Sequence, residues 1–508
     1  MKRFLIVALI LFLGVAQVWA QRKKGDPLPP EVEQALMRNR ERAEALLHKA
    51  AEALGGGEVK SIQYSGSGYH FALGQSVNPR AAWPKFNLKS YSRVINYLTA
   101  SSQEEMVRTQ FENPARGGGA QPIVGEQRQV LSVGGGETYA WNGVGSAATS
   151  NPGAAEERAL MVWLTPHGYI RAALAGAPGV TTEVRGGRKL QTVSSRVSGK
   201  FTLRGFINEL NLVERVETHI GNPVLGDMMI ATNFSDYKDF GGFKFPSRIV
   251  QEQGGFPVLD LTIESVKLNA PADIQAPSSV VRASAPAVRV ESQKIADGVW
   301  YLTGGTHHSV AVEFATYVVV IEAPQNEDRS LAVIAEVKKL APQKPIRYLI
   351  NTHHHFDHSG GIRAYSAEGA SIITHQMNEP FYRRAASTSW KLSPDALSKS
   401  RRRMTIVTML DKRVLSDGSR VIELHHIKGS RHNDGIIMAY MPREKLLIEA
   451  DVFTPGAANA PPPATPNVFT VNLYENLQRL KLPVEQIAPL HGRLVTMSDL
   501  LKAIGRTS

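Results

Sequence analysis

Four histidines and one aspartate occupy the six positions from His353 to His358, within the stretch THHHFDHSGG. The chain of 508 residues contains no cysteine, so a metal bound here must be held by nitrogen and oxygen ligands. A cluster this dense constrains the fold, because its side chains can converge only if the backbone turns between them. The flanking sequence predicts such a turn at the end of a strand.

The cluster follows the apolar, β-rich run IRYLINT and precedes GGIRAYSAEGA, which predicts a short helix, and then the strand-like SIITH. Proteins of the α/β type commonly place ligand sites in the loop between a strand and a crossover helix. Alternate residues of an extended segment point to one side, so His353 and His355 can reach one metal. Asp357 and His358, turned by the start of the helix, can reach a second metal beside it.

The pattern His-x-His-x-Asp-His at positions 353–358 is the signature of the metallo-β-lactamase superfamily, which the second half of the chain resembles along most of its length. Three further residues stand in the order of that superfamily, each at or just beyond the C-terminal end of a β-rich run: His432 in KGSRHNDG, Asp451 in KLLIEAD and His491 in APLHGR. The resemblance implies an αββα sandwich in which these strand ends meet along one edge.

Carried over residue by residue, the resemblance implies two neighbouring metal sites. The expected ligands are His353, His355 and His432 for the first metal, Asp357, His358 and His491 for the second, and Asp451 as a bridge between them. Two zinc ions per chain are expected, and iron or manganese accepts the same donors. A metal-bridging hydroxide would attack the substrate, and Asp357 would be the catalytic residue that orients this nucleophile and handles its proton.

Other polar residues near the motif are expected to support it. His354 is expected to point away from the metals. His307 and His308, in GGTHHSV, lie where the first hairpin of the superfamily borders the cleft, and a structural role is expected for both. Glu322 stands where relatives usually show an aspartate and is expected to support the ligand loop rather than to bind metal.

The N-terminal half has a different pattern of residue types. Residues 29–54 carry apolar side chains at helical spacing and end at three glycines, which predicts a helix. From residue 61 to 269, short β-branched and aromatic segments separated by Gly, Asn and Pro predict an antiparallel sheet, interpreted as a non-catalytic accessory domain. The stretch DYKDFGGFKFP, residues 236–246, resembles a turn and strand of lipoprotein-carrier half-barrels. This resemblance implies an apolar concavity that could take a lipid or another apolar ligand.

Composition predicts a division into four parts. Residues 1–20 combine two basic residues with an apolar run and predict a secretory signal peptide, with an uncleaved anchor as the alternative. The accessory domain is expected over 21–269, a linker rich in Ala, Pro and Ser over 270–290, and the catalytic domain over 291–508. No later run is apolar enough for a transmembrane helix, so a periplasmic or secreted protein is expected. The net charge of +12 is dispersed, and no nucleic-acid partner is expected.

The residue at the expected bridging position, Asp451, narrows the range of activities that we expect. True β-lactamases of this fold generally carry cysteine or serine where this chain has Asp451, and the aspartate resembles the dinuclear sites of glyoxalase II, lactonases and phosphodiesterases. We therefore expect an exported dinuclear zinc hydrolase that cleaves an ester, lactone or thioester bond of a small-molecule substrate. Two alternatives remain open: a mononuclear iron sulfur-dioxygenase of the same fold, and a periplasmic protein that binds a lipid or apolar ligand through its N-terminal sheet.

Overall fold

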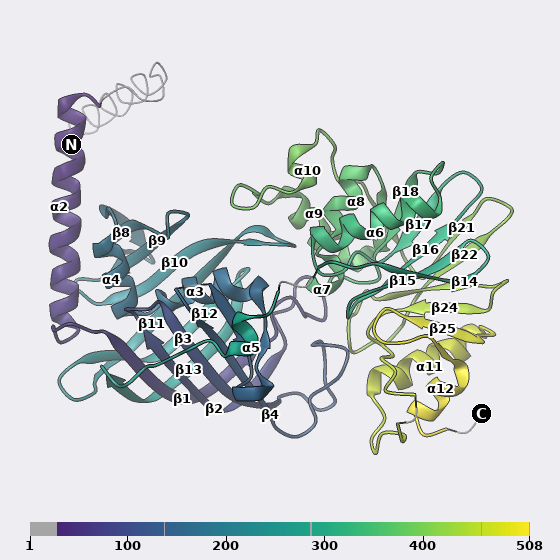
Figure 1. Cartoon of the computed structure of the whole chain (residues 1–508), viewed down its shortest axis with the longest axis horizontal. Helices are drawn as coiled ribbons and strands as arrows, with labels where there is room; N and C mark the ends of the chain where they lie inside the picture. The colour runs from purple at the N-terminus through teal and green to yellow at the C-terminus, as the bar shows by residue number, and fades with distance from the viewer. Residues whose placement is uncertain (1–27, 137, 285–286, 459, 507–508) are drawn as a thin grey trace.

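The computed structural model describes residues 28–136, 138–284, 287–458 and 460–506, and the predicted signal peptide lies outside these residues. Figure 1 shows a large sheet formed by the N-terminal half beside a C-terminal half in which sheets lie between helices. In the part of the chain that the structure describes, no helix is long and apolar enough to cross a membrane.

The first element is helix α2, Pro30–Ala53, which confirms the helix predicted over residues 29–54. A proline at the first helical position is favourable because its missing N–H has no partner there in any case. Ala43, Leu47 and Ala50 form a fully buried stripe along the helix. The helix ends before Gly55, whose φ of +114° suits a residue without Cβ.

Thirteen strands form one antiparallel sheet, which confirms the sheet predicted for this half. The first strand, β1, pairs with both β2 and β13, so the two ends of this region meet in the middle of the sheet. The strands are β1 (Ser61–Phe71), β2 (Lys85–Asn96), β3 (Ser101–Gln110), β4 (Gln127–Gly134), β5 (Tyr139–Asn142), β6 (Thr149–Ser150), β7 (Gly179–Arg185), β8 (Arg188–Val197), β9 (Phe201–Ile207), β10 (Val213–Asn222), β11 (Gly226–Asp239), β12 (Lys244–Gln253) and β13 (Phe256–Leu268).

Two helices that the sequence pattern did not predict interrupt this sheet region, α3 (Ala155–Val162) and α4 (Pro166–Ala175). The start of α4 has a local signal: the Oγ1 of Thr165 accepts a hydrogen bond from the backbone N of Gly168 at 3.1 Å, and a proline follows the cap. The hydroxyl of the fully buried Tyr169 donates to the carbonyl oxygen of Val193 at 2.7 Å. This bond holds α4 against strand β8.

The segment over 270–290, predicted as a linker, has no strand among its described residues and contains one helical turn, α5 (Ser278–Val281). Val280 is buried and packs against Trp141 of the N-terminal sheet. Part of this segment therefore packs against the N-terminal half of the chain.

The C-terminal half contains two further sheets. One has seven strands, β14 (Glu291–Ala296), β15 (Val299–Thr303), β16 (Ser309–Glu313), β17 (Val318–Ile321), β18 (Ile346–Ile350), β19 (Ser371–His375) and β20 (Ile406–Met409). The other has six, β21 (Lys412–Ser416), β22 (Val421–His426), β23 (Ile437–Met441), β24 (Leu446–Glu449), β25 (Gln486–Pro489) and β26 (Val495–Thr496).

Three apolar cores separate the C-terminal half into four layers. The two sheets face each other across a core that contains Val312, Ile350 and Ile448. Helices α6 (Glu327–Leu340) and α8 (Ile362–Glu368) pack on the outer face of the first sheet. Helices α11 (Val468–Leu480) and α12 (Met497–Ala503) pack on the outer face of the second. The predicted αββα sandwich is confirmed.

Candidate metal centre

The motif lies where the sequence pattern placed it, at the carboxyl end of strand β18. This strand runs parallel to its neighbours β17 and β19. His353 and His355 stand in the extended segment after the strand, while Asp357 and His358 belong to the single-turn helix α7 (Phe356–Ser359). Figure 1 shows α7 on the side of the C-terminal layers that faces the N-terminal sheet.

Three other loops bring the remaining predicted ligands to the same edge. His432 lies between β22 and β23, while Asp451 and His491 each stand two residues beyond the parallel strands β24 and β25. Asp451 has a φ of +63°, a left-handed conformation that residues other than glycine seldom adopt and that clusters at functional sites.

The side chains form two donor groups of four residues, in each of which the donor atoms lie within 4.8 Å of one another, and a third, smaller group joins Glu322 to His353 and His358. The first group contains His353, His355, His432 and Asp451, and the second contains His307, Asp357, His358 and His491. The structure therefore brings all seven predicted ligands together and adds His307, which sequence reasoning had placed only at the border of the cleft.

Asp451 connects the two groups through its two oxygens. Its Oδ2 lies 3.1 Å from Nε2 of His432, and its Oδ1 lies 2.7 Å from Nε2 of His491. Its Oδ1 also lies 3.1 Å from Nε2 of His358. The carboxylate is 1% exposed, and neither oxygen has a hydrogen-bond partner of suitable geometry among the described residues. A buried carboxylate without such partners is costly unless a cation neutralises it, so this arrangement fits a metal on each side.

Hydrogen bonds fix which nitrogen of three imidazoles faces the donor groups. Nδ1 of His358 lies 3.0 Å from Oε2 of Glu322, and Nε2 of His355 lies 2.9 Å from the carbonyl oxygen of Ser76. Both partners only accept, so a proton sits on each of these nitrogens, and the opposite ring nitrogen presents a lone pair when the ring is neutral. Nδ1 of His353 bonds the hydroxyl of Thr352 at 3.0 Å, which leaves its Nε2 for the site. Neutral imidazoles oriented in this way are the ligands that zinc prefers.

Burial and neighbouring charges act differently on the ligands: burial acts to lower the pKa of His358, but the charges of Asp451 and Asp357 outweigh it and raise that pKa well above its usual value. Burial lowers the pKa of His353 and of His355 well below the usual range, which keeps both imidazoles neutral. Burial acts to raise the pKa of Asp357, but the positive field of His358 and a hydrogen bond from His307 outweigh it and hold the pKa below its usual value. The carboxylate is therefore ionised.

Glu322 supports the ligand loop, in agreement with its expected role. It is fully buried, and its Oε2 accepts from Oγ1 of Thr352 at 2.6 Å as well as from His358. Its Oε1 accepts from the side chain of Asn351. Because its lone pairs are used in these bonds, Glu322 orients His358 and the strand end rather than offering a free donor.

The other histidines of the region have partners outside the two groups. His354 bonds Asn378 and the hydroxyl of Ser76, each at 3.1 Å, and so points away from the donor groups as expected. Nε2 of His308 bonds the carbonyl oxygen of Gly492 at 2.8 Å, which fits its expected structural role.

Two residues of the N-terminal half reach the site, and sequence reasoning missed both. Nε2 of Gln75 donates to Oδ1 of Asp357 at 2.7 Å, and Ser76 contacts His355 as described above. Their segment, ALGQSVNPR, contains no recognisable catalytic or metal-binding motif. Only the fold brings it to the metal centre.

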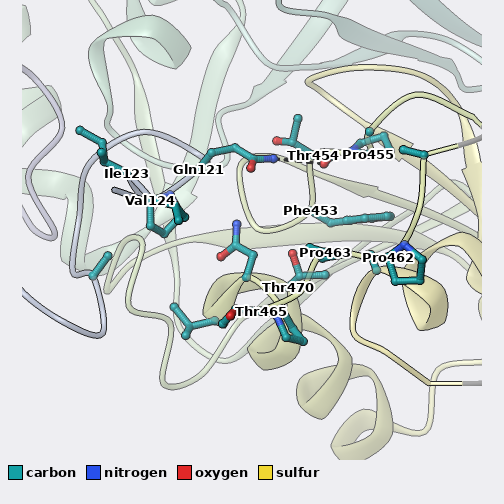
Figure 2. A pocket seen from close by; sticks show the side chains of 18 of the residues that line it. Gln121, Ile123, Val124, Phe453, Thr454, Pro455, Pro462, Pro463, Thr465 and Thr470 are labelled. Atoms are coloured by element: carbon teal, nitrogen blue, oxygen red, sulfur yellow. Dashed lines mark hydrogen bonds between the residues drawn. The ribbon is translucent and has the colours of Figure 1, made fainter. Parts of the chain in front are cut away.

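A cavity of about 800 Å³ lies between the two halves of the chain, next to the loops that carry Asp451 and His491. In Figure 2, Ile123 and Val124 line one side, facing Phe453 and the prolines of the 453–470 loop. Gln121 crosses towards that loop and donates to the carbonyl oxygen of Thr454 at 3.4 Å. The donor groups themselves do not line this cavity, which begins two residues beyond Asp451.

Residues 302–472 match the family model of the metallo-beta-lactamase superfamily. A curated relative, 2,4-dinitroanisole O-demethylase subunit alpha from Nocardioides sp. (strain JS1661), is 26% identical over 165 residues, which are 32% of this chain and 47% of the relative. The alignment thus spans about half the length of that relative.

Solved structures with a similar arrangement include metallo-beta-lactamases from Pontibacter korlensis (18% identity, 43% of this chain and 98% of that chain, TM-score 0.34) and from Hirschia baltica (18%, 42% and 95%, 0.32). Rubredoxin oxygen:oxidoreductase from Desulfovibrio gigas is also similar (18%, 42% and 61%, 0.33). Together with the family match and the four-layer fold, the assembled donor groups place the C-terminal half of this chain in the metallo-beta-lactamase superfamily, a family of metal-dependent, hydrolase-type enzymes.

Proposed function

We propose that this protein is an exported hydrolase that uses two zinc ions to cleave an ester, lactone or thioester bond. The observation that carries the proposal is the position of Asp451, whose two buried oxygens are divided between two separate donor groups. A single metal would use only one of these groups. The second group, in which His358 is fully buried and the other three side chains are partly exposed, would then be a set of converging donors without a cation.

Seven side chains would hold the metal pair. His353, His355 and His432 surround one position, Asp357, His358 and His491 surround the other, and Asp451 lies between them. Bound zinc supplies a Lewis acid for the substrate carbonyl and lowers the pKa of water towards 7. His307 also belongs to the second group. Its Nε2 lies 3.3 Å from Oδ2 of Asp357, so it can donate a hydrogen bond to that carboxylate and fix its orientation.

Proton handling falls to Asp357 among the carboxylates of the site. Its side chain is 31% exposed, whereas that of Asp451 is 1% exposed, so only Asp357 can meet a substrate from the solvent side. One of its oxygens is fixed by Gln75. The other oxygen, Oδ2, lies 3.3 Å from Nε2 of His307 on the side of the donor group, where it would accept the proton of an attacking water and return it to the leaving group.

The cavity between the two halves suits an apolar acyl or aryl portion of a substrate. Its walls combine Ile123 and Val124 with Phe453 and the prolines of the loop that follows Asp451. Arg493, two residues beyond His491, also lines it and pairs with Asp499 at 3.0 Å. An uncharged substrate with an apolar arm fits this lining, because apolar walls bind by removing such surface from water.

The proposal is tested by metal analysis and hydrolysis assays on the full-length mature protein. We expect close to two zinc ions per chain, and fewer in Asp357→Ala and in His432→Ala. Nitrophenyl esters of increasing acyl length, lactones and a thioester form the substrate panel. The relative named as an O-demethylase adds 2,4-dinitroanisole to this panel. Cell fractionation tests export.

The two alternatives predict different outcomes of the same experiments. One iron per chain with oxygen consumption on a persulfide substrate would identify the sulfur-dioxygenase. Absence of bound metal, with lipid in an organic extract of the purified full chain, would favour the apolar-ligand binder. The presence of four donors in each of two groups favours the dinuclear hydrolase over both.

A further inference from the structure

The loop between strands β1 and β2, residues 72–84, extends from the N-terminal sheet into the metal centre of the other half. We propose that this loop is part of the metal centre, with Gln75 and Ser76 as positioning residues that orient Asp357 and His355. The inference rests on the proposed function, because it assigns these residues to the ligands of the metal pair. It gives the N-terminal sheet a role beyond that of an accessory cover.

Ser76 acts on the first donor group through its backbone. Its carbonyl oxygen accepts from Nε2 of His355 at 2.9 Å, and the residue is 2% exposed. This bond places the ring proton on Nε2. The other nitrogen, Nδ1, is buried without a hydrogen-bond partner among the described residues and belongs to the first donor group. A metal ligand whose second nitrogen donates to a carbonyl is fixed in both tautomer and ring orientation.

Gln75 acts on the second donor group through its amide. Its Nε2 donates to Oδ1 of Asp357 at 2.7 Å, so this oxygen is occupied. The other oxygen, Oδ2, lies 3.3 Å from Nε2 of His307 and 3.8 Å from Nε2 of His358, both members of the second group, and is the one directed into that group. The bond therefore selects which oxygen of Asp357 serves as donor. The Oε1 of Gln75 is buried and has no partner in the described part of the chain, so it is free to accept from a polar group that enters the site.

The loop is fixed to the C-terminal half on both sides of these two residues. On one side, the carbonyl oxygen of Gly74 accepts from the backbone N of Phe356 at 3.2 Å. On the other, the carbonyl oxygen of Val77 accepts from the backbone N of Asp434 at 2.7 Å, and Asn78 donates to the Asp434 carboxylate at 2.8 Å. These anchors adjoin the ligands on either side, since Phe356 precedes Asp357 and Asp434 follows His432 by two residues.

Gly74 is needed for the close approach. Its φ is +77°, and a Cβ added there would lie 2.3 Å from Cγ of Phe356. Trp83, from the same loop, packs edge to face on the Phe356 ring with the centroids 5.6 Å apart. A side chain at position 74 would force the loop away from α7 and so move both positioning residues.

The experiment uses the full-length protein, with Zn²⁺ and Co²⁺ as probes. Gln75→Met keeps the length of the side chain and removes its hydrogen bonds. We expect it to retain the first metal and to bind the second about 10- to 100-fold more weakly, as measured by chelator competition. The absorption spectrum of the cobalt-loaded protein should change only in the band that appears with the second equivalent. Gln121→Met is the matched control, because Gln121 also crosses between the halves but bonds the backbone of Thr454 and, among the described residues, no predicted metal ligand.

A second variant, Gly74→Ala, tests the loop as a whole. We expect it to weaken both metals, with a thermal transition of the metal-free protein that shows the chain still folds. If Gln75→Met and Gly74→Ala bind both metals as tightly as wild type, the positioning role is wrong while the dinuclear site stands. If the wild type itself binds fewer than two ions, the proposed function fails, and the inference about the loop fails with it.

Discussion

The Nδ1 of His358 donates to Oε2 of Glu322 at 3.0 Å, and both side chains are fully buried. The other nitrogen of His358 faces Asp451 at 3.1 Å. His358 thus lies between the carboxylate of Glu322 and the donor group, as in sites where a carboxylate hydrogen-bonded to a metal-bound histidine raises the basicity of that histidine.

Glu322→Gln should weaken the second metal about 10- to 100-fold while the first metal is retained. Glutamine keeps the shape of the side chain but loses the charge that fixes the proton on Nδ1 of His358. Zinc affinity by chelator competition measures the effect. Glu423→Gln is the control, because Glu423 also bonds a histidine, His425, at 3.0 Å but lies outside both donor groups. Equal affinities in wild type and Glu322→Gln would contradict the assigned role.

Removing Asp451 should have a larger effect than removing Asp357. Asp451 belongs to the first donor group, and its Oδ1 also lies 3.1 Å from Nε2 of His358 and 2.7 Å from Nε2 of His491 in the second. Asp451→Ala should therefore lose both metals, whereas Asp357→Ala should keep one. Native mass spectrometry of the zinc-loaded variants gives the number of bound ions directly. One tightly bound ion in Asp451→Ala would contradict this expectation, because one of the two sites would then be independent of this carboxylate.

Much of the C-terminal half could be predicted because its signals are local. The pattern at 353–358 places its residues at a strand end and a helix start, and β18 and α7 follow that pattern. The strands before Asp451 and His491 are short apolar runs, fully or largely buried, and these are readily found in sequence. The ends of parallel strands share an edge, so assembly of the ligands followed from their positions.

The residues that the sequence could not assign to the site reach it over long distances in the chain. Gln75 is 282 positions from Asp357, and nothing near it in sequence suggests a ligand. His307 is brought to His491 by an isolated bridge between their backbones, with ring centroids 4.1 Å apart. Helix α4 was missed for a different reason: its capping signal, Thr165 followed by proline, lies within a region of strand-forming segments.

Phe469 couples the helical layer to the metal centre. It is fully buried on α11, and its ring packs against that of His432 with the centroids 5.2 Å apart. Phe469→Ala should lower the free energy of unfolding by about 3–5 kcal/mol because of the cavity it leaves. It should also weaken binding of the first metal, because the ring of His432 loses the side chain against which it packs. Urea denaturation and zinc competition measure the two effects. Phe111→Ala, at an exposed position, is the control. Unchanged zinc affinity in Phe469→Ala would contradict the expected coupling between this core residue and the metal centre.

The stability of the N-terminal sheet should fall at acid pH because of two histidines. Burial lowers the pKa of His167, which stacks on Phe245, to about 4, and burial together with Arg108 lowers the pKa of His70 to about 3. In the unfolded chain both titrate near 6.5. Between pH 6.5 and about 4 the unfolded chain therefore binds protons that the folded chain does not, so stability is complete above pH 6.5 and is lost as the pH falls.

The variant His167→Phe should remove part of this acid sensitivity, on the order of 2–3 kcal/mol between pH 7 and pH 4. The phenylalanine keeps a ring against Phe245 and has no proton to take up. Urea denaturation of the metal-free protein at both pH values isolates the effect from loss of zinc. If His167→Phe loses as much stability as wild type on acidification, then His167 is protonated in the folded state and the sheet admits that charge without opening.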